Sequence, residues 1–208
     1  MDEKPLTASL RYYGISPWEI EVVYNLFNEK FLVVEEVLKE ELKAKELGVG
    51  YDEFVSALSI TIPLPFNEEF FKWFEFREWE KVKHIIKEMK RRRGKGNAIL
   101  VQIFFKNQEW NKVHSVILSD NADILPDYPN VLFVIDSSEN HNFNSAIEKI
   151  DFMVELLPYH LNHSKMKKFC KKPMVVRYYY DIQSGKWYLG YVLTLDGGRV
   201  FYIDDLRD

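Results

Sequence analysis

The pattern of apolar and polar positions first becomes regular after Ser16. The segment Ser16-Pro17-Trp18-Glu19 has the features of a helix start. A serine hydroxyl can accept hydrogen bonds from free backbone N–H groups, proline fits the first helical position, and Glu19 completes a capping box. Apolar residues then recur at helical spacing: Val22, Val23, Leu26, Phe27, Phe31, Val34, Val37, Leu38 and Leu42. The pattern predicts one long helix or two stacked helices that end near Gly48.

The middle of the chain carries one strand signal and one ambiguous segment. Leu58, Ile60 and Ile62 alternate with polar residues before a proline-containing stretch, which predicts a strand. Residues 70–76 are consistent with a strand, or with the opening turns of a helix that continues to Met89.

Short runs rich in valine, isoleucine and phenylalanine dominate the rest of the chain. Bounded by turn residues, they predict strands at 98–105, 113–118 and 131–135. Ser145 and Glu148 form a second capping box, before a helical stripe that Pro158 can end. The last three runs, at 174–180, 187–195 and 200–203, are joined by short glycine-containing segments and predict an antiparallel meander.

These elements predict the α+β class. We expect a helical N-terminal region, residues 1–48, packed on a mixed or antiparallel sheet that ends in a three-stranded antiparallel meander. Residues 1–208 form a single domain in this interpretation, with Gly48-Val49-Gly50 as the best candidate for an internal boundary.

The composition narrows the class of protein. The chain has 208 residues, of which 47% are hydrophobic and 29% charged, and this excludes a disordered or collagen-like chain. A single cysteine, Cys170, excludes a disulfide framework within one chain. No apolar run approaches the ~18–20 residues of a membrane span. We therefore expect a soluble cytoplasmic protein that does not contact a membrane.

A net charge of −4 argues against a protein that coats nucleic acid through its overall charge, so any such site is local. Two basic clusters are candidates: Lys81, Lys83, Lys87, Lys90, Arg91, Arg92, Arg93 and Lys95 form the first, and Lys165, Lys167, Lys168, Lys171 and Lys172 the second. Consecutive arginines fan around a helix and can contact phosphates. The alternative for the first cluster is that its cations stabilise the C-terminal end of a helix through the helix dipole. The alternative for the second cluster is a solvated loop.

The predicted meander brings a further nucleic-acid candidate. Strand alternation places Arg177, Tyr179, Tyr188 and Gly190 on one face, where RNA or single-stranded DNA bases could stack. The alternative is a half-covered outer face of the sheet. The predicted nucleic-acid residues are Lys90, Arg91, Arg92, Arg93, Lys95, Lys167, Lys168, Lys171, Tyr179 and Tyr188.

One polar loop carries catalytic candidates. Asp136 follows a predicted strand, and together with Glu139 and His141 it could converge on a hard cation or supply an acid and a base. The alternative is an ordinary turn before a helix. Apart from this hypothesis of a metal-dependent hydrolase or transferase, we predict no metal site and no cofactor.

Seven aromatic residues lie between positions 66 and 79, more than one buried face requires. If the segment is helical, Trp73 and Phe76 lie opposite the main apolar stripe, where they form an interface or are covered by the N-terminal helix. We therefore rank a non-catalytic interaction or assembly protein first, with a homo-oligomer or protein partner. A nucleic-acid-binding protein is second, and a metal-dependent hydrolase or transferase third.

Overall fold

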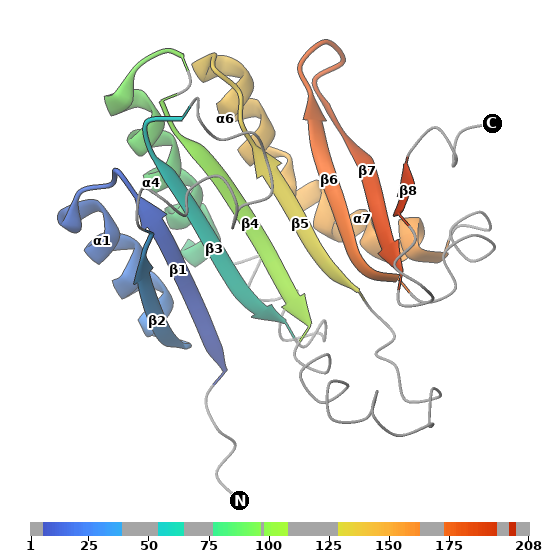
Figure 1. Ribbon diagram of the computed structural model, residues 1–208, viewed down its shortest axis with the longest axis horizontal. Coiled ribbons are helices and arrows are strands. Elements are labelled where there is room, and N and C mark those ends of the chain that lie inside the picture. The colour runs from blue at the N-terminus through green and yellow to red at the C-terminus, as the bar shows by residue number, and fades with distance from the viewer. Residues whose placement is uncertain are drawn as a thin grey trace, which may run out of the picture.

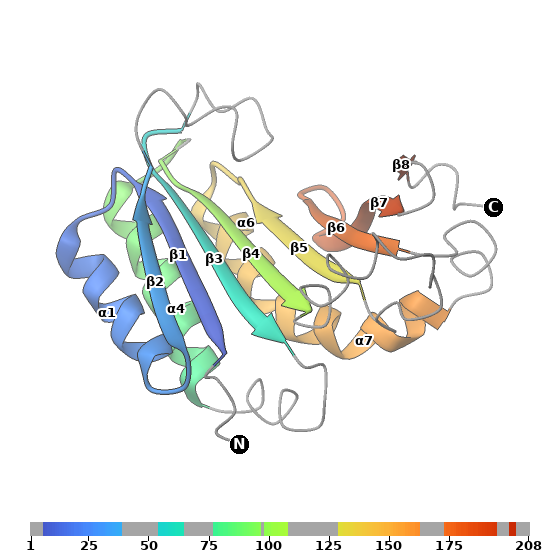
Figure 2. The same ribbon diagram turned by 60° about the horizontal axis from the view of Figure 1, so that its bottom comes forward.

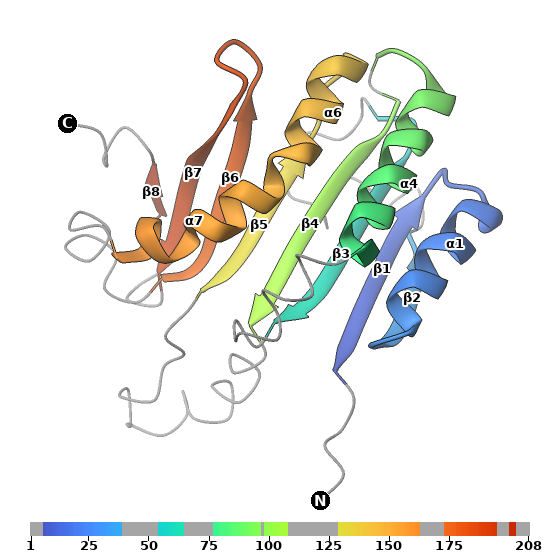
Figure 3. The same cartoon turned by 180° about the vertical axis from the view of Figure 1, so that it is seen from behind.

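The computed structural model describes residues 6–38, 54–64, 77–96, 98–107, 129–162, 173–194 and 200–202. These residues build two layers, a mixed sheet and a layer of helices that lies on one of its faces (Figure 1; Figure 3 shows the helical side). In chain order the described elements are β1 (Thr7–Tyr13), α1 (Pro17–Asn28), β2 (Leu32–Val37), β3 (Ala57–Leu64), α4 (Arg77–Arg93), β4 (Leu100–Asn107), β5 (Asn130–Ile135), α6 (Asn140–Glu148), α7 (Ile150–Asn162), β6 (Pro173–Asp181), β7 (Lys186–Thr194) and β8 (Val200–Tyr202).

The described strands form one sheet in the order β2-β1-β3-β4-β5-β6-β7-β8. Parallel pairs join β1 to β2, β3 to β4 and β5 to β6. The first pair is connected in the sequence through α1, the second through α4, and the third through α6 and α7. The other neighbours are antiparallel, and β6, β7 and β8 form a meander. The helices of all three β-helix-β units lie on the same face of the sheet (Figure 3).

The core lies between the sheet and the helices. Alternate residues of the strands point toward the helices, so the central strands contribute fully buried side chains such as Ile60, Ile103 and Phe133. The Phe133 and Tyr178 rings stack with their centroids 5.2 Å apart. Each large apolar side chain that is buried in this way contributes about 1.5–3 kcal/mol to folding.

The predicted α+β class, the mixed sheet and the closing meander are confirmed. The strands expected at 58–62, 98–105 and 131–135 correspond to β3, β4 and β5. The helix start at Ser16 is also confirmed, because the Ser16 hydroxyl and the Glu19 carboxylate each accept a hydrogen bond from the other's backbone N–H.

The length of the N-terminal helix was predicted wrongly. It ends at Asn28, where the N–H groups of Lys30 and Phe31 both bond to the Phe27 carbonyl, and the valines beyond it lie in β2. Apolar residues at positions 33, 34 and 37 fit a helical stripe and a strand equally well, and pairing with β1 decides between them. Within residues 6–38, the part of this region that the structure describes, the chain therefore forms the two strands β1 and β2 besides the predicted helix.

The second capping box was also predicted wrongly. Ser145 and Glu148 lie inside α6, which begins at Asn140, and the Ser145 hydroxyl accepts a hydrogen bond from the Tyr180 hydroxyl at 2.8 Å. Pro158 lies within α7 and does not end it. Because a serine can bond to a tertiary partner as well as to a helix end, the sequence motif alone does not fix its role.

Several predictions lie outside the described residues: the boundary at 48–50, the aromatic pair Trp73 and Phe76, the strand at 113–118, and Lys167, Lys168 and Lys171. Among the described helices, none is long and apolar enough to cross a membrane.

Candidate interaction surfaces

The strand β2 lies at one end of the sheet (Figure 2). Three of its six residues are exposed apolar side chains, Leu32 at 53%, Val34 at 51% and Val37 at 66%. Arg11 of β1 lies on the helix-free face of the sheet, and it binds Glu36 of β2 at 2.8 Å, so Glu36 lies on that face too. Because side chains alternate along a strand, Leu32 and Val34 share this face with Glu36. An edge strand with exposed apolar side chains is typical of a site at which another strand pairs.

The outer edge of β2 offers free backbone positions. The N–H groups of Leu32 and Leu38 bond inward, to the carbonyls of Leu6 and Tyr12, at 2.8 Å in each case. Because N–H and C=O groups alternate in direction along a strand, Val33, Glu35 and Val37 direct theirs outward. No described strand pairs with this edge.

The contact between α1 and α4 is fixed by a buried ion pair. The Glu19 side chain is 8% exposed, and the Arg93 guanidinium donates to both of its carboxylate oxygens, at 2.8 and 2.7 Å. These hydrogen bonds, supported by others from Ser16 and opposed by burial, lower the pKa of Glu19 to about 2. Arg93 also donates to the Gly14 and Met89 carbonyls, so this arginine joins α4 to the start of α1.

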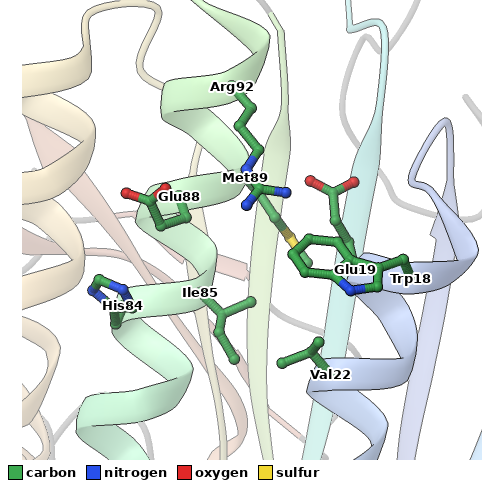
Figure 4. Close-up of a pocket in the computed structure, with 8 residues that line it drawn as sticks. All are labelled: Trp18, Glu19, Val22, His84, Ile85, Glu88, Met89 and Arg92. Atoms are coloured by element: carbon green, nitrogen blue, oxygen red, sulfur yellow. The ribbon is translucent and has the colours of Figure 1, made fainter.

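Beside this ion pair, α1 and α4 enclose a groove of about 220 Å³ (Figure 4). It is lined by Trp18, Glu19 and Val22 of α1 and by His84, Ile85, Glu88, Met89 and Arg92 of α4. The Arg92 guanidinium lies over the Trp18 ring, 4.6 Å from its centroid, and Trp18 is 55% exposed. The groove therefore combines an apolar floor with an exposed cation–π pair.

The first basic cluster divides into structural and exposed cations. Lys90 is fully buried and donates to the carbonyls of Gly96 and Ser138, at 2.8 Å each. Burial lowers the pKa of Lys90, while the nearby Glu139 carboxylate acts in the opposite direction. Together with Arg93, Lys90 is engaged inside the protein, so these two predicted phosphate contacts have structural partners instead.

Three cations of this cluster, Arg91, Arg92 and Lys95, lie at the surface. Arg91 is 67% exposed and bonds to Glu88 of its own helix at 2.6 Å. Arg92 and Lys95 are also exposed, and Arg92 lines the groove. The exposed part of the cluster is therefore smaller than its sequence indicates.

Lys83 belongs to a second structural network on α4. Its side chain is 2% exposed and lies 2.6 Å from both Glu80 and Asp151, and 3.3 Å from Glu148. Burial of the ammonium lowers its pKa, but the three carboxylates outweigh this effect and raise the pKa above that of an ordinary lysine. The network joins α4 to α6 and α7.

The predicted tyrosine face exists on the helix-free side of β6 and β7. The rings of Tyr179 and Tyr188 stack at 5.9 Å, and the Arg177 guanidinium lies 5.5 Å from the centroid of the Tyr191 ring. Gly190 permits this arrangement, because a Cβ atom there would approach the Tyr179 ring and the Arg177 carbonyl oxygen to 3.2 Å. Tyr179 is 39% exposed.

The catalytic candidates lie in the loop between β5 and α6 and at the start of α6. Asp136, Glu139 and His141 are all exposed, and Glu139 is the N-cap residue of α6. Protein atoms around the Asp136 carboxyl raise its pKa, whereas a backbone hydrogen bond and the charge of Arg177 lower it. Among the described residues, no three His, Cys, Asp or Glu side chains are grouped so that they could hold a metal ion, so these three do not converge on one.

The sequence interpretation missed two features of these surfaces. Trp18 was assigned to the helix start, and Val34 to the apolar stripe of a helix. The high β propensity of the valines at positions 33, 34 and 37 was the signal that could have identified β2.

Comparisons of this chain with protein-family models, with curated protein sequences and with solved structures gave no match. The functional argument therefore depends on the surfaces described above.

Proposed function

We propose that this protein is a non-catalytic interaction and assembly protein whose chains pair through the outer edge of β2. The observation that carries the proposal is the exposure of Leu32, Val34 and Val37 on one strand at the end of the sheet. A second copy of the chain is the proposed partner, because the edge is self-complementary under two-fold symmetry.

Charge selects the register of this pairing. In an antiparallel pair with the two-fold axis through Val34, Val34 faces its own copy, Val33 faces Glu35, and Leu32 faces Glu36. The next register places Glu35 against Glu35, which like-charge repulsion disfavours. The glutamates also have partners within the chain, since Glu35 accepts from the Tyr12 hydroxyl and Glu36 from Arg11. Pairing on the axis at Val34 therefore leaves no carboxylate opposite another.

Light scattering after size-exclusion chromatography tests the assembly. We expect a mass of about twice 24.8 kDa for the unchanged chain, and a monomer for Val34→Lys, which places two ammonium groups on the axis. Val55→Lys is the matched control, because Val55 is 76% exposed but lies outside β2. A monomeric unchanged chain at every concentration, or equal dissociation by both variants, refutes the proposal.

Disulfide cross-linking tests the register. In the Cys170→Ser background, Val34→Cys should form a linked dimer, because opposed residues of a non-hydrogen-bonded pair have Cα atoms ~4.5 Å apart, within disulfide range. Glu36→Cys should not, since it faces Leu32 of the other copy. Preferential cross-linking through position 36 refutes the register.

A second candidate function is binding of single-stranded nucleic acid on the tyrosine face. The stacked pair Tyr179 and Tyr188, beside Arg177, favours it, because bases stack on such side chains. Fluorescence anisotropy with labelled RNA at about 50 and 200 mM salt tests it: salt-sensitive binding that Tyr179→Ala weakens supports this function. Binding that Tyr179→Ala leaves unchanged contradicts it.

A further inference from the structure

The groove between α1 and α4 holds an apolar floor beside a guanidinium. In Figure 4, Val22 of α1 and Ile85 of α4 point toward one another, and Arg92 extends from α4 over Trp18. Met89 lies between the helices and is buried, whereas Val22 and Ile85 are only partly covered. Apolar surface of this kind gains from contact with another apolar group.

Of the three arginines beside the groove, Arg92 is the one that forms no ion pair with a described carboxylate, although its charge also acts on Glu88. Arg93 binds Glu19, and Arg91 binds Glu88. Within the described residues Arg92 forms no ion pair, and its contact is with the Trp18 ring. Among these described side chains, the three arginines and two glutamates give an excess of one positive charge at this end of the groove. A guanidinium that lies over a ring can still donate N–H groups to a carboxylate.

We propose that this groove binds a segment of a partner protein that inserts one apolar side chain against Val22, Ile85 and Met89 and places an adjacent carboxylate on Arg92. The size of the groove favours a protein segment over a metabolite. About 220 Å³ lies below the ~300–1,000 Å³ of sites that enclose a whole small molecule, but suits a single side chain. Tryptophan, arginine and methionine are also enriched at protein interfaces.

The proposal is independent of β2 pairing. The groove lies between α1 and α4, whereas β2 pairs through the outer edge of the sheet. Loss of dimerisation in Val34→Lys therefore leaves peptide binding in the groove unchanged. The two proposals fail separately.

The test is a titration of the ¹⁵N-labelled chain with two matched peptides, followed through the indole N–H signal of Trp18. The acidic probe is acetyl-Gly-Glu-Leu-Glu-Gly-amide, and its neutral counterpart has both glutamates replaced by glutamine. The chain has five tryptophans, so Trp18→Phe assigns the signal. We expect the acidic probe to shift the Trp18 signal and to bind about tenfold more tightly than the neutral one, as a charge-assisted hydrogen bond implies.

Two variants separate the Arg92 contact from general electrostatic attraction. Arg92→Gln should remove the preference for the acidic probe, whereas Lys95→Gln should retain it, because Lys95 is an exposed cation that does not line the groove. Circular dichroism confirms that both variants are folded.

Four results overturn the proposal. Equal affinity for the two probes would show that no carboxylate binds Arg92. An unshifted Trp18 signal at millimolar peptide would show that the groove does not bind the peptide. If the Trp18 signal shifts with protein concentration in the absence of peptide, the groove binds a second copy of the chain instead. Binding of N-acetyl-leucine as tightly as the acidic peptide assigns it to a small carboxylic acid.

Discussion

Replacing Arg93 with methionine removes the buried partner of Glu19. The pKa of Glu19 falls from 4.5 to about 2 in the folded chain. At 1.36 kcal/mol for each pKa unit, this difference corresponds to ~3 kcal/mol of stabilisation. Part of it comes from Ser16, so we expect Arg93→Met to reduce the free energy of unfolding at pH 7 by about 2 kcal/mol.

The loss should depend on pH in a defined direction. Because the folded-state pKa of Glu19 is depressed, its stabilising effect is complete above about pH 4.5 and is lost as the pH falls through about 2. In Arg93→Met the carboxylate has lost its cation, so it takes up a proton at a higher pH. The difference in unfolding free energy between the two chains should therefore shrink as the pH falls from about 4.5 to 2.

Urea denaturation followed by circular dichroism, at pH 7 and at pH values down to about 2.5, measures both effects. Arg91→Met is the matched control, because its ion pair with Glu88 lies at the surface, and we expect no measurable change in stability. The reasoning is refuted if the two variants are equally stable, or if the loss in Arg93→Met is the same at every pH.

Three further predictions concern other close contacts. Gly14→Ala should destabilise the chain by ~3 kcal/mol in thermal or urea denaturation, because the φ of Gly14 is +62° and a Cβ atom there would lie 2.5 Å from a carbonyl oxygen. Gly94→Ala is the control: its φ is +80°, but a Cβ atom there meets open space, so the variant should lose only ~1 kcal/mol of stability. Equal losses in the two variants would contradict the clash at Gly14. Lys83→Met should lower the free energy of unfolding, measured by urea denaturation, by about 2 kcal/mol, since it leaves the partly buried Asp151 carboxylate without its cation. Adding Asp151→Asn to this variant should recover part of the loss. If the losses of the two single variants simply add in the double variant, Lys83 and Asp151 do not interact. Gly190→Ala should cost ~1 kcal/mol and shift the Tyr179 ring signals in a proton spectrum, and an unchanged spectrum would contradict the close approach.

The sequence by itself determined the elements whose signals are local. The capping box at Ser16 and the glycine-containing turn between β6 and β7 involve residues only a few positions apart. Each predicted its element because the interactions that form it are also short in sequence. The alternation in β3 and the β-branched and aromatic runs of β4 and β5 predicted their strands for the same reason, since both signals are properties of a short stretch of sequence.

Only the tertiary structure decided what the basic cluster on α4 does. Lys83 bonds to Asp151, Lys90 to the Ser138 carbonyl and Arg93 to Glu19, partners that lie 68, 48 and 74 positions away in the sequence. Which cations are buried depends on how α4 packs against α1, α6 and α7, and no local pattern encodes that packing.

The order of the strands was likewise decided by tertiary structure. The residues of β2 are compatible with a helix or with a strand anywhere in a sheet, and the crossover through α1 places them at the end. That position leaves Val34 exposed and the backbone of Val33 and Glu35 directed outward. The candidate interface therefore follows from topology, because exposure is a property of which neighbours a strand has and not of its own sequence.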